Sequence, residues 1–221
     1  MTKDMTTGPI PPLLVNFTIP LVLGNLFQLT YNAVDSIIVG KFVGEDALAA
    51  VGTSNPLMTL AILFINGMCL GAGILVSTAF GAGDTKLVER QVSTTALAGT
   101  AFSLTFSLAC ILLANPLLRL LQVPAEILPL AVNYLRIVFS GLIFTFFYNF
   151  LAATLRALGD LKITLNSSML NMAGRVAGAA VFVLMFNMDI EALPYSYVVG
   201  WVLMLLYETP VLVRHLKNGR L

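Results

Sequence analysis

Long apolar stretches alternate with short polar breaks along the whole chain. A helix that crosses the hydrocarbon core of a bilayer needs about 20 mostly apolar residues. Six stretches reach that length, at residues 13–39, 51–79, 92–114, 127–155, 162–187 and 193–213. The breaks between them contain glycine, proline, asparagine and aspartate, which end helices. The pattern therefore predicts an all-α integral membrane protein, a bundle of six transmembrane helices.

Basic residues orient this predicted bundle. Most of them fall on one side of the six stretches: Lys3, Lys86, Arg90, Arg156, Lys162, Arg214, Lys217 and Arg220, against Lys41 and Arg119 on the other side. Loops rich in lysine and arginine remain cytoplasmic. We therefore expect a multi-pass protein of the plasma membrane, the inner membrane in a bacterium. Its transmembrane domain would span residues 13–213, between a cytoplasmic segment at 1–12 and a basic cytoplasmic tail at 214–221.

The composition excludes several other classes of protein. Of the 221 residues, 58% are hydrophobic and 10% are charged, whereas a soluble domain has roughly 25% charged residues. The net charge of +1 leaves no basic patch to neutralise nucleic-acid phosphates. Cys69 and Cys110 lie in apolar runs without metal-ligand spacing, so we expect no metal site. The lone His215 has no nucleophile or acid beside it, and we expect no enzyme activity.

A carboxylate inside the first apolar stretch is the first candidate for function. Asn25, Gln28, Asn32 and Asp35 are spaced so that a helix would place them in one polar stripe. An ionisable group inside a membrane helix is costly, and it usually faces a cavity or a partner. Asp35 is therefore a candidate for cation or proton coupling, with Asn32 and Tyr31 as neighbouring candidates. The alternative is an acid at the helix end, close to the outer interface.

The second and fourth stretches add candidates for a substrate cavity. Asn55 and Asn66 belong to a second polar stripe, which faces either a cavity or a closely packed helix. Tyr148 belongs to an aromatic cluster that suits flat or cationic ligands, although such rings also pack in cores and against lipid. With Asn25, Gln28 and Tyr31, these residues form the predicted substrate cavity.

The fifth stretch contains a basic residue that needs a partner. Arg175 follows Asn171 by one helical turn, and an arginine inside the bilayer favours pairing with an acid. Because Asp35 is the only acid that we place well inside an apolar stretch, we hypothesise an ion pair between Asp35 and Arg175. Asn171 and Arg175 therefore join Asp35 and Asn32 as candidates for cation or proton coupling. Gly174 and Gly178 in the same stretch predict close packing against another helix.

Several segments resemble one transporter family. Residues 19–40, with Asp35 near their end, and residues 44–52 are similar to the first helix and first loop of multidrug and toxic compound extrusion (MATE) transporters. Further matching segments are Asn55-Pro56, Gly81-Ala-Gly-Asp84, Tyr134-Leu-Arg136 and Leu155-Arg-Ala-Leu-Gly-Asp160. The resemblance is strong over about residues 10–165.

The resemblance implies a function and a coupling residue. Such proteins export drugs and organic cations in exchange for H⁺ or Na⁺, by rocking two six-helix halves, and they use no other cofactor. In proton-coupled members the first-helix aspartate, here Asp35, is the protonation site of the N-terminal lobe. That assignment agrees with the interpretation of the polar stripe.

The chain also departs from the family pattern. It has six predicted spans where the family has twelve, so it corresponds to one lobe. Arg175 stands where the N-terminal lobe usually has an aspartate, and the ending from Gly200 to Arg220 resembles the close of a complete transporter. Two halves related by an axis along the membrane normal can pair without inverting topology. We therefore expect a half transporter that works as a parallel homodimer or with a second half.

Two alternatives remain open at this point. A flippase for lipids or lipid-linked oligosaccharides would hold pyrophosphate headgroups in a basic cavity, with Arg136 and Arg175 as its support. A truncated or structural membrane protein would not transport at all.

Overall fold

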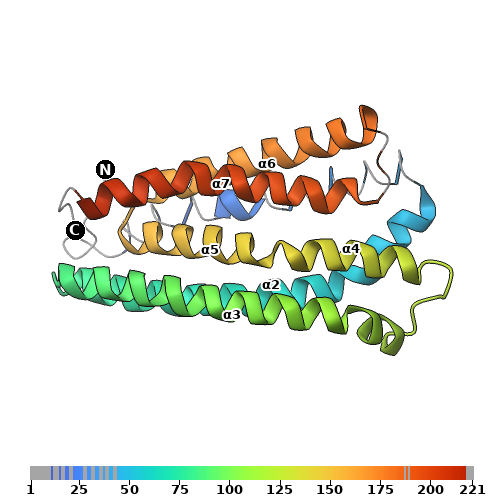
Figure 1. Cartoon of the computed structure of the whole chain (residues 1–221). Coiled ribbons are helices and arrows are strands. Elements are labelled where there is room, and N and C mark those ends of the chain that lie inside the picture. The colour runs from blue at the N-terminus through green and yellow to red at the C-terminus, as the bar shows by residue number, and fades with distance from the viewer. Residues whose placement is uncertain are drawn as a thin grey trace.

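The described part of the chain is helical apart from short turns (Figure 1). The computed structural model describes residues 44–186, 188 and 190–217, and before them residues 11, 15, 18–19, 22–26, 29–30, 33–34, 37 and 40–41. Six helices follow residue 44: α2 (Glu45–Gly81), α3 (Thr85–Leu120), α4 (Leu128–Ser140), α5 (Leu142–Ala157), α6 (Leu161–Leu184) and α7 (Ala192–Lys217). The described residues contain no strand, as the sequence pattern predicts.

The helix boundaries follow the predicted breaks. Between α2 and α3, Gly83 adopts φ 71°, a left-handed conformation that glycine takes without strain. Asp84 then caps α3, because its side chain accepts a hydrogen bond from the Leu87 amide at 2.9 Å. Gly159, at φ 81°, makes the corresponding turn between α5 and α6, and Asp160 is the N-cap of α6. Local turn chemistry thus sets where these helices end.

The number of membrane spans in the described residues is four or five. Helices α2, α3, α6 and α7 are each long and apolar enough to cross a bilayer. Helices α4 and α5 pass the same test together, bent by 44° at the break between them. The predicted count of six is not confirmed, because most of the first predicted span, 13–39, lies outside the described residues. The fourth predicted span, 127–155, is two helices and not one.

Gly141 forms the break between α4 and α5. A side chain there would collide with Trp201 of α7, since a methyl group built on Gly141 would lie 2.5 Å from its ring. On the other side of the break, the Ser107 hydroxyl of α3 donates to the Phe139 carbonyl at 2.6 Å. A bent helix inside a bilayer is tolerated where neighbours supply such partners. The bend is therefore supported by α3 and α7.

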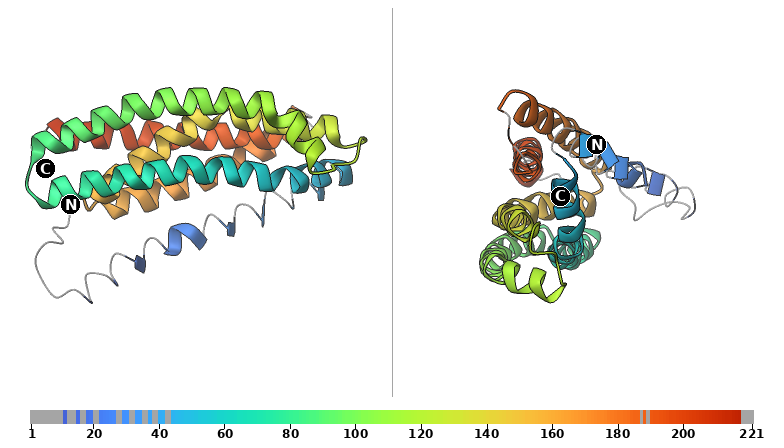
Figure 2. Two further views of the ribbon diagram at one scale, coloured as in Figure 1. Left: turned by 90° about the horizontal axis from the view of Figure 1, so that it is seen from below. Right: turned by 90° about the vertical axis from the view of Figure 1, so that its right-hand side faces the viewer.

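The helices form layers, with α4 and α5 in the middle (Figures 1 and 2). Helices α6 and α7 lie on one side of this layer and α2 and α3 on the other. Tyr134, Phe139 and Phe146 of the middle layer are fully buried or nearly so. Many leucines of α2 and α3 are exposed, which is the pattern of a surface that faces lipid. The core therefore lies on the bent α4–α5 pair.

The α6–α7 contact is close. Gly178 packs against Ser196, and a methyl group built on Gly174 would lie 2.4 Å from Leu203. Small residues let membrane helices approach each other. The predicted packing role of Gly174 and Gly178 is confirmed.

Candidate functional site

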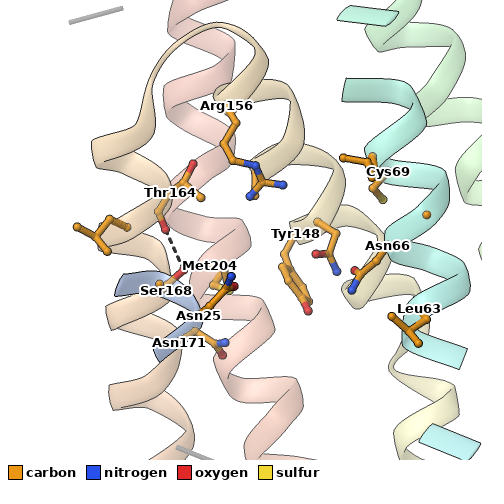
Figure 3. Close-up of a pocket in the computed structure, with 16 residues that line it drawn as sticks. Asn25, Leu63, Asn66, Cys69, Tyr148, Arg156, Thr164, Ser168, Asn171 and Met204 are labelled. Carbon is orange, nitrogen blue, oxygen red and sulfur yellow. Dashed lines mark hydrogen bonds between the residues drawn. The ribbon is translucent and has the colours of Figure 1, made fainter. Parts of the chain in front are cut away.

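A pocket of about 540 Å³ opens between the 22–26 piece and helices α2, α5, α6 and α7 (Figure 3). Its lining includes Gly24, Asn25, Leu63, Asn66, Gly67, Cys69, Leu70, Tyr148, Asn149, Ala152, Arg156, Thr164, Leu165, Ser168, Asn171 and Met204. Concave sites of this size, with apolar walls and a few polar groups, bind small molecules. The pocket is therefore the candidate functional site.

Amides supply much of the polar lining. Asn25, Asn66, Asn149 and Asn171 come from four different segments. The side-chain oxygens of Asn66 and Asn171 are buried and accept no hydrogen bond from the described residues. Unpaired acceptors are costly in a low-dielectric site. The Asn171 oxygen packs against Gly200 of α7, where a methyl group would lie 2.1 Å from it.

An aromatic wall stands behind one side of the pocket. Tyr148 lines it and stacks on Trp201, with ring centroids 6.2 Å apart. Trp201 in turn contacts Tyr197, whose hydroxyl is 3.3 Å from that of Tyr134. Tyr148 therefore presents an aromatic surface that α7 holds in place.

Arg175 belongs to this wall and not to the lining of the pocket. Its guanidinium lies over the Tyr197 ring, 3.8 Å from the centroid, and its side chain is buried. Gly200 makes the arrangement possible, because a methyl group there would lie 2.1 Å from Asn171 Oδ1 and 2.7 Å from Arg175 Cγ. An arginine over an aromatic face gains cation–π attraction. Asp35, the hypothesised partner of Arg175, lies outside the described residues.

The other predicted site residues fall into three groups. Asn25, Asn66, Tyr148 and Asn171 meet in the pocket, although they lie far apart in the sequence. Asn55 is exposed and does not line the pocket. It stands about 16 Å along α2 from Asn66, at the helical rise of about 1.5 Å per residue. Gln28, Tyr31, Asn32 and Asp35 lie outside the described residues.

One charged group of the site was missed by sequence reasoning. Glu208 of α7 is 0% exposed, so Asp35 is not the only acid well inside an apolar stretch. Its Oε1 accepts a hydrogen bond from Ser167 at 2.5 Å. Glu208 stands near the end of the sixth apolar stretch without other polar residues at helical spacing, so no stripe points to it. Its position within the apolar run was the available signal.

Arg156 connects Glu208 with the pocket. It comes from the last turn of α5 and points into the pocket (Figure 3). Its charge acts on Glu208, and the Glu208 charge acts on it. Arg156 is the one charged side chain among the described residues that line the pocket. A buried carboxylate of α7 therefore lies within electrostatic reach of a guanidinium that lines the pocket.

A smaller pocket of about 330 Å³ lies apart from the first, between the end of α3 and α4. Arg119 and Arg136 line it, together with Asn133, which donates to the Glu191 carboxylate. Arg136 is exposed there, consistent with a side chain that reaches the membrane–water interface.

Among the described residues, no group of three or more His, Cys, Asp or Glu side chains could hold a metal ion.

Known proteins match this chain over most of its length. The MatE family model matches residues 20–183. "Probable multidrug resistance protein YpnP" of Bacillus subtilis (strain 168) is 32% identical over 212 residues, which cover 96% of this chain and 48% of YpnP. YoeA of the same organism, also named a probable multidrug resistance protein, is 34% identical over 152 residues, which cover 66% of this chain and 32% of YoeA.

Solved structures show the same fold. A transporter from Pyrococcus furiosus, described as a member of the MOP superfamily with reversed polarity of its binding pocket, superposes with a TM-score of 0.88 at 21% identity. The match covers 96% of this chain and 47% of that transporter. The chain thus spans about half the length of the relatives that it matches most fully. Members of this family are transporters, which fits the expectation that the chain is not an enzyme. From the matched residues and the shared fold, the chain belongs to the MATE family of multi-pass membrane proteins.

Proposed function

We propose that this chain is one half of a multidrug exporter and that its pocket binds the exported molecule. The observation behind this proposal is the pocket of about 540 Å³ inside the membrane helices, with amides and an aromatic ring in its lining. The names of YpnP and YoeA describe multidrug resistance proteins, which supports the same function. The chain would lie in the plasma membrane with both termini cytoplasmic.

The proposed substrates are small drugs or organic cations. Tyr148 offers a flat ring, and aromatic faces attract cations. The amide side chains of Asn25, Asn66, Asn149 and Asn171 line the pocket and would supply its polar contacts to the ligand. Apolar groups such as Leu63 and Met204 would contact its hydrocarbon. This combination suits ligands that differ in shape but share an apolar body with few polar groups.

Export would be coupled to the entry of H⁺ or Na⁺. Asp35 is the proposed coupling residue in the first predicted span, with Asn32 and Asn171 as polar neighbours. An intramembrane carboxylate can bind either cation and release it on the other side. The flippase alternative has less support, because Arg136 lines a separate pocket and Arg175 packs on Tyr197.

Filling the pocket should stop transport. Gly67 lines the pocket, whereas Gly71 lies one turn further along α2 and does not, and a methyl group at either glycine would meet nothing within 4 Å. We expect Gly67→Phe to lower efflux of ethidium from proteoliposomes by about tenfold or more, a loss of roughly 1.4 kcal/mol. Gly71→Phe is the matched control and should retain efflux. Equal efflux in both variants would contradict the pocket as the substrate site.

Removing the Asp35 charge should uncouple export. In proteoliposomes with an imposed H⁺ or Na⁺ gradient, Asp35→Asn should abolish gradient-driven ethidium efflux, because an amide cannot exchange a cation. Asp46→Asn, at the exposed start of α2, is the control. No gradient-driven flux in the wild-type protein would instead favour the nontransporting alternative.

A further inference from the structure

We propose that Glu208 is a proton-binding site and that Arg156 transmits its change of charge to the pocket. The proton site stands on the described contacts alone, whereas its effect on a bound cation rests on the proposed function. The site differs from the one expected at Asp35, since Glu208 belongs to α7 and binds Ser167 of α6.

The first argument is burial. The Glu208 side chain is 0% exposed inside α7, and its Oε2 finds no hydrogen-bond partner among the described residues. A carboxylate in a membrane helix with one oxygen unpaired is costly. Such residues persist in membrane proteins mainly where they serve a function.

The second argument is that Ser167 can satisfy both protonation states. Its Oγ lies 2.5 Å from Glu208 Oε1 and 3.0 Å from the Thr164 carbonyl oxygen, yet a hydroxyl has one proton to donate. When Glu208 is ionised, Ser167 donates to Oε1. When Oε1 is protonated, the carboxyl donates to Ser167 Oγ, and Ser167 donates to Thr164. The proton comes from hydronium in the solvent, whose O–H bond breaks as the carboxyl O–H bond forms, and no other covalent bond changes.

The neighbouring charges favour a proton over a metal ion. Arg156 of α5 acts on Glu208, so a second full cation beside the carboxylate would be repelled. Cys69 of α2 lies near Arg156, and Tyr207 precedes Glu208 on α7 and receives a hydrogen bond from Asn166 at 3.4 Å. Arg175 of α6 and Tyr134 of α4 contact Tyr197, which is three turns away along α7. Arg156 is therefore the nearby charged group whose charge is offset when Glu208 is ionised.

The protonation state of Glu208 should change how well the pocket binds an organic cation. With Glu208 ionised, the Arg156 charge is offset, and the pocket can accept an organic cation. With Glu208 protonated, Arg156 presents an uncompensated positive charge to the pocket and disfavours that cation. Proton uptake and cation release are thereby linked in the direction that an exchange of H⁺ for substrate needs.

Infrared spectra of the full chain in nanodiscs test the proton site directly. We expect a carbonyl band of a protonated carboxyl group whose intensity grows as pH falls. The spectra are compared in an Asp35→Asn background, where residue 35 contributes no carboxyl band. There the band should be absent after Glu208→Gln and present after Glu191→Gln, a control carboxylate just before α7. No titrating band, or a band retained in Glu208→Gln, would overturn the proposal.

A second variant keeps the test decisive if Glu208→Gln does not fold. Ser167→Ala removes the hydroxyl that bonds Oε1, and it should shift both the frequency of the band and the midpoint of its titration. An unchanged frequency and midpoint would assign the band to another carboxyl group and overturn the proposal.

Equilibrium binding of ethidium to the same samples tests the link to the pocket. Wild-type affinity should fall as pH falls. Glu208→Gln should bind about tenfold more weakly than the wild type at high pH, the effect of one uncompensated charge in a partly hydrated site. Adding Arg156→Gln should restore binding, and wild-type affinity in Glu208→Gln alone would overturn the link. Failure of ethidium to bind the wild type at any pH would contradict the proposed function, while the infrared result decides the proton site separately.

Discussion

At the scale of single residues, small side chains decide which polar groups can be buried. Gly200 lets Asn171 and Arg175 of α6 lie directly against α7. Gly99 likewise lets the Phe146 ring of α5 lie directly against α3, because a methyl group on Gly99 would lie 2.1 Å from that ring. The polar and aromatic groups beside the pocket therefore depend on residues that have no functional group of their own.

Gly200→Ala should destabilise the protein. The added methyl group would overlap Asn171 and Arg175, and overpacking of this kind costs about 1–3 kcal/mol. We expect a lower midpoint of thermal unfolding for the detergent-purified protein. Gly71→Ala is the control, since a methyl group there meets nothing within 4 Å. Equal midpoints for the two variants would show that α7 shifts to make room for the methyl group without a loss of stability.

At the scale of the elements, the α4–α5 break places the aromatic wall. The bend of 44° turns α5 relative to α4, so that Tyr148 lines the pocket while Tyr134 of α4 contacts Tyr197. Ser107 of α3 and Trp201 of α7 support the break from two sides. The sequence predicts one uninterrupted span here, because hydropathy does not change at Gly141.

Ser107→Ala should weaken the bend. Ser107 is buried and donates to the Phe139 carbonyl, so its loss removes a partner from a buried acceptor and costs about 1–3 kcal/mol. Thermal unfolding in detergent measures the effect. Ser77→Ala is matched to it, since exposed Ser77 bonds only within its own helix and should change the midpoint little. A smaller effect at Ser107 than at Ser77 would contradict the role of this hydrogen bond.

At the scale of the whole molecule, the chain matches about half of its larger relatives. The described helices form a bundle with its own core and pocket, but the matches cover 48% of YpnP and 47% of the Pyrococcus furiosus transporter. In the proposed homodimer, a second copy of the chain supplies the other half. A two-fold pair would place two copies of the pocket around one axis.

Counting subunits in native membranes should give two. If a fluorescently tagged chain forms the proposed parallel homodimer, single-molecule photobleaching should show mainly two steps per particle. A tagged monomeric membrane protein expressed at the same level is the control. Single-step bleaching throughout would contradict the homodimer and favour pairing with a different half or the nontransporting alternative.

Much of this protein was predictable because local rules determine it. Apolar stretches long enough to span a bilayer determined the membrane class and the approximate helix positions. Gly83, Asp84, Gly159 and Asp160 marked the turns, since left-handed glycines and caps act on their own neighbours. Four of the predicted site residues line one pocket, although helical spacing placed each of them only on a face of its own helix.

What the sequence alone determined is therefore the class of the protein, the order of its helices and which residues share a face of each helix. Periodicity locates a residue relative to its own helix axis but says nothing of the neighbour it meets. Only the tertiary structure brought Glu208 to Ser167, aimed Arg156 into the pocket and placed Arg175 over Tyr197. These contacts depend on how one helix packs against another, even where the two helices, α6 and α7, are consecutive in the sequence.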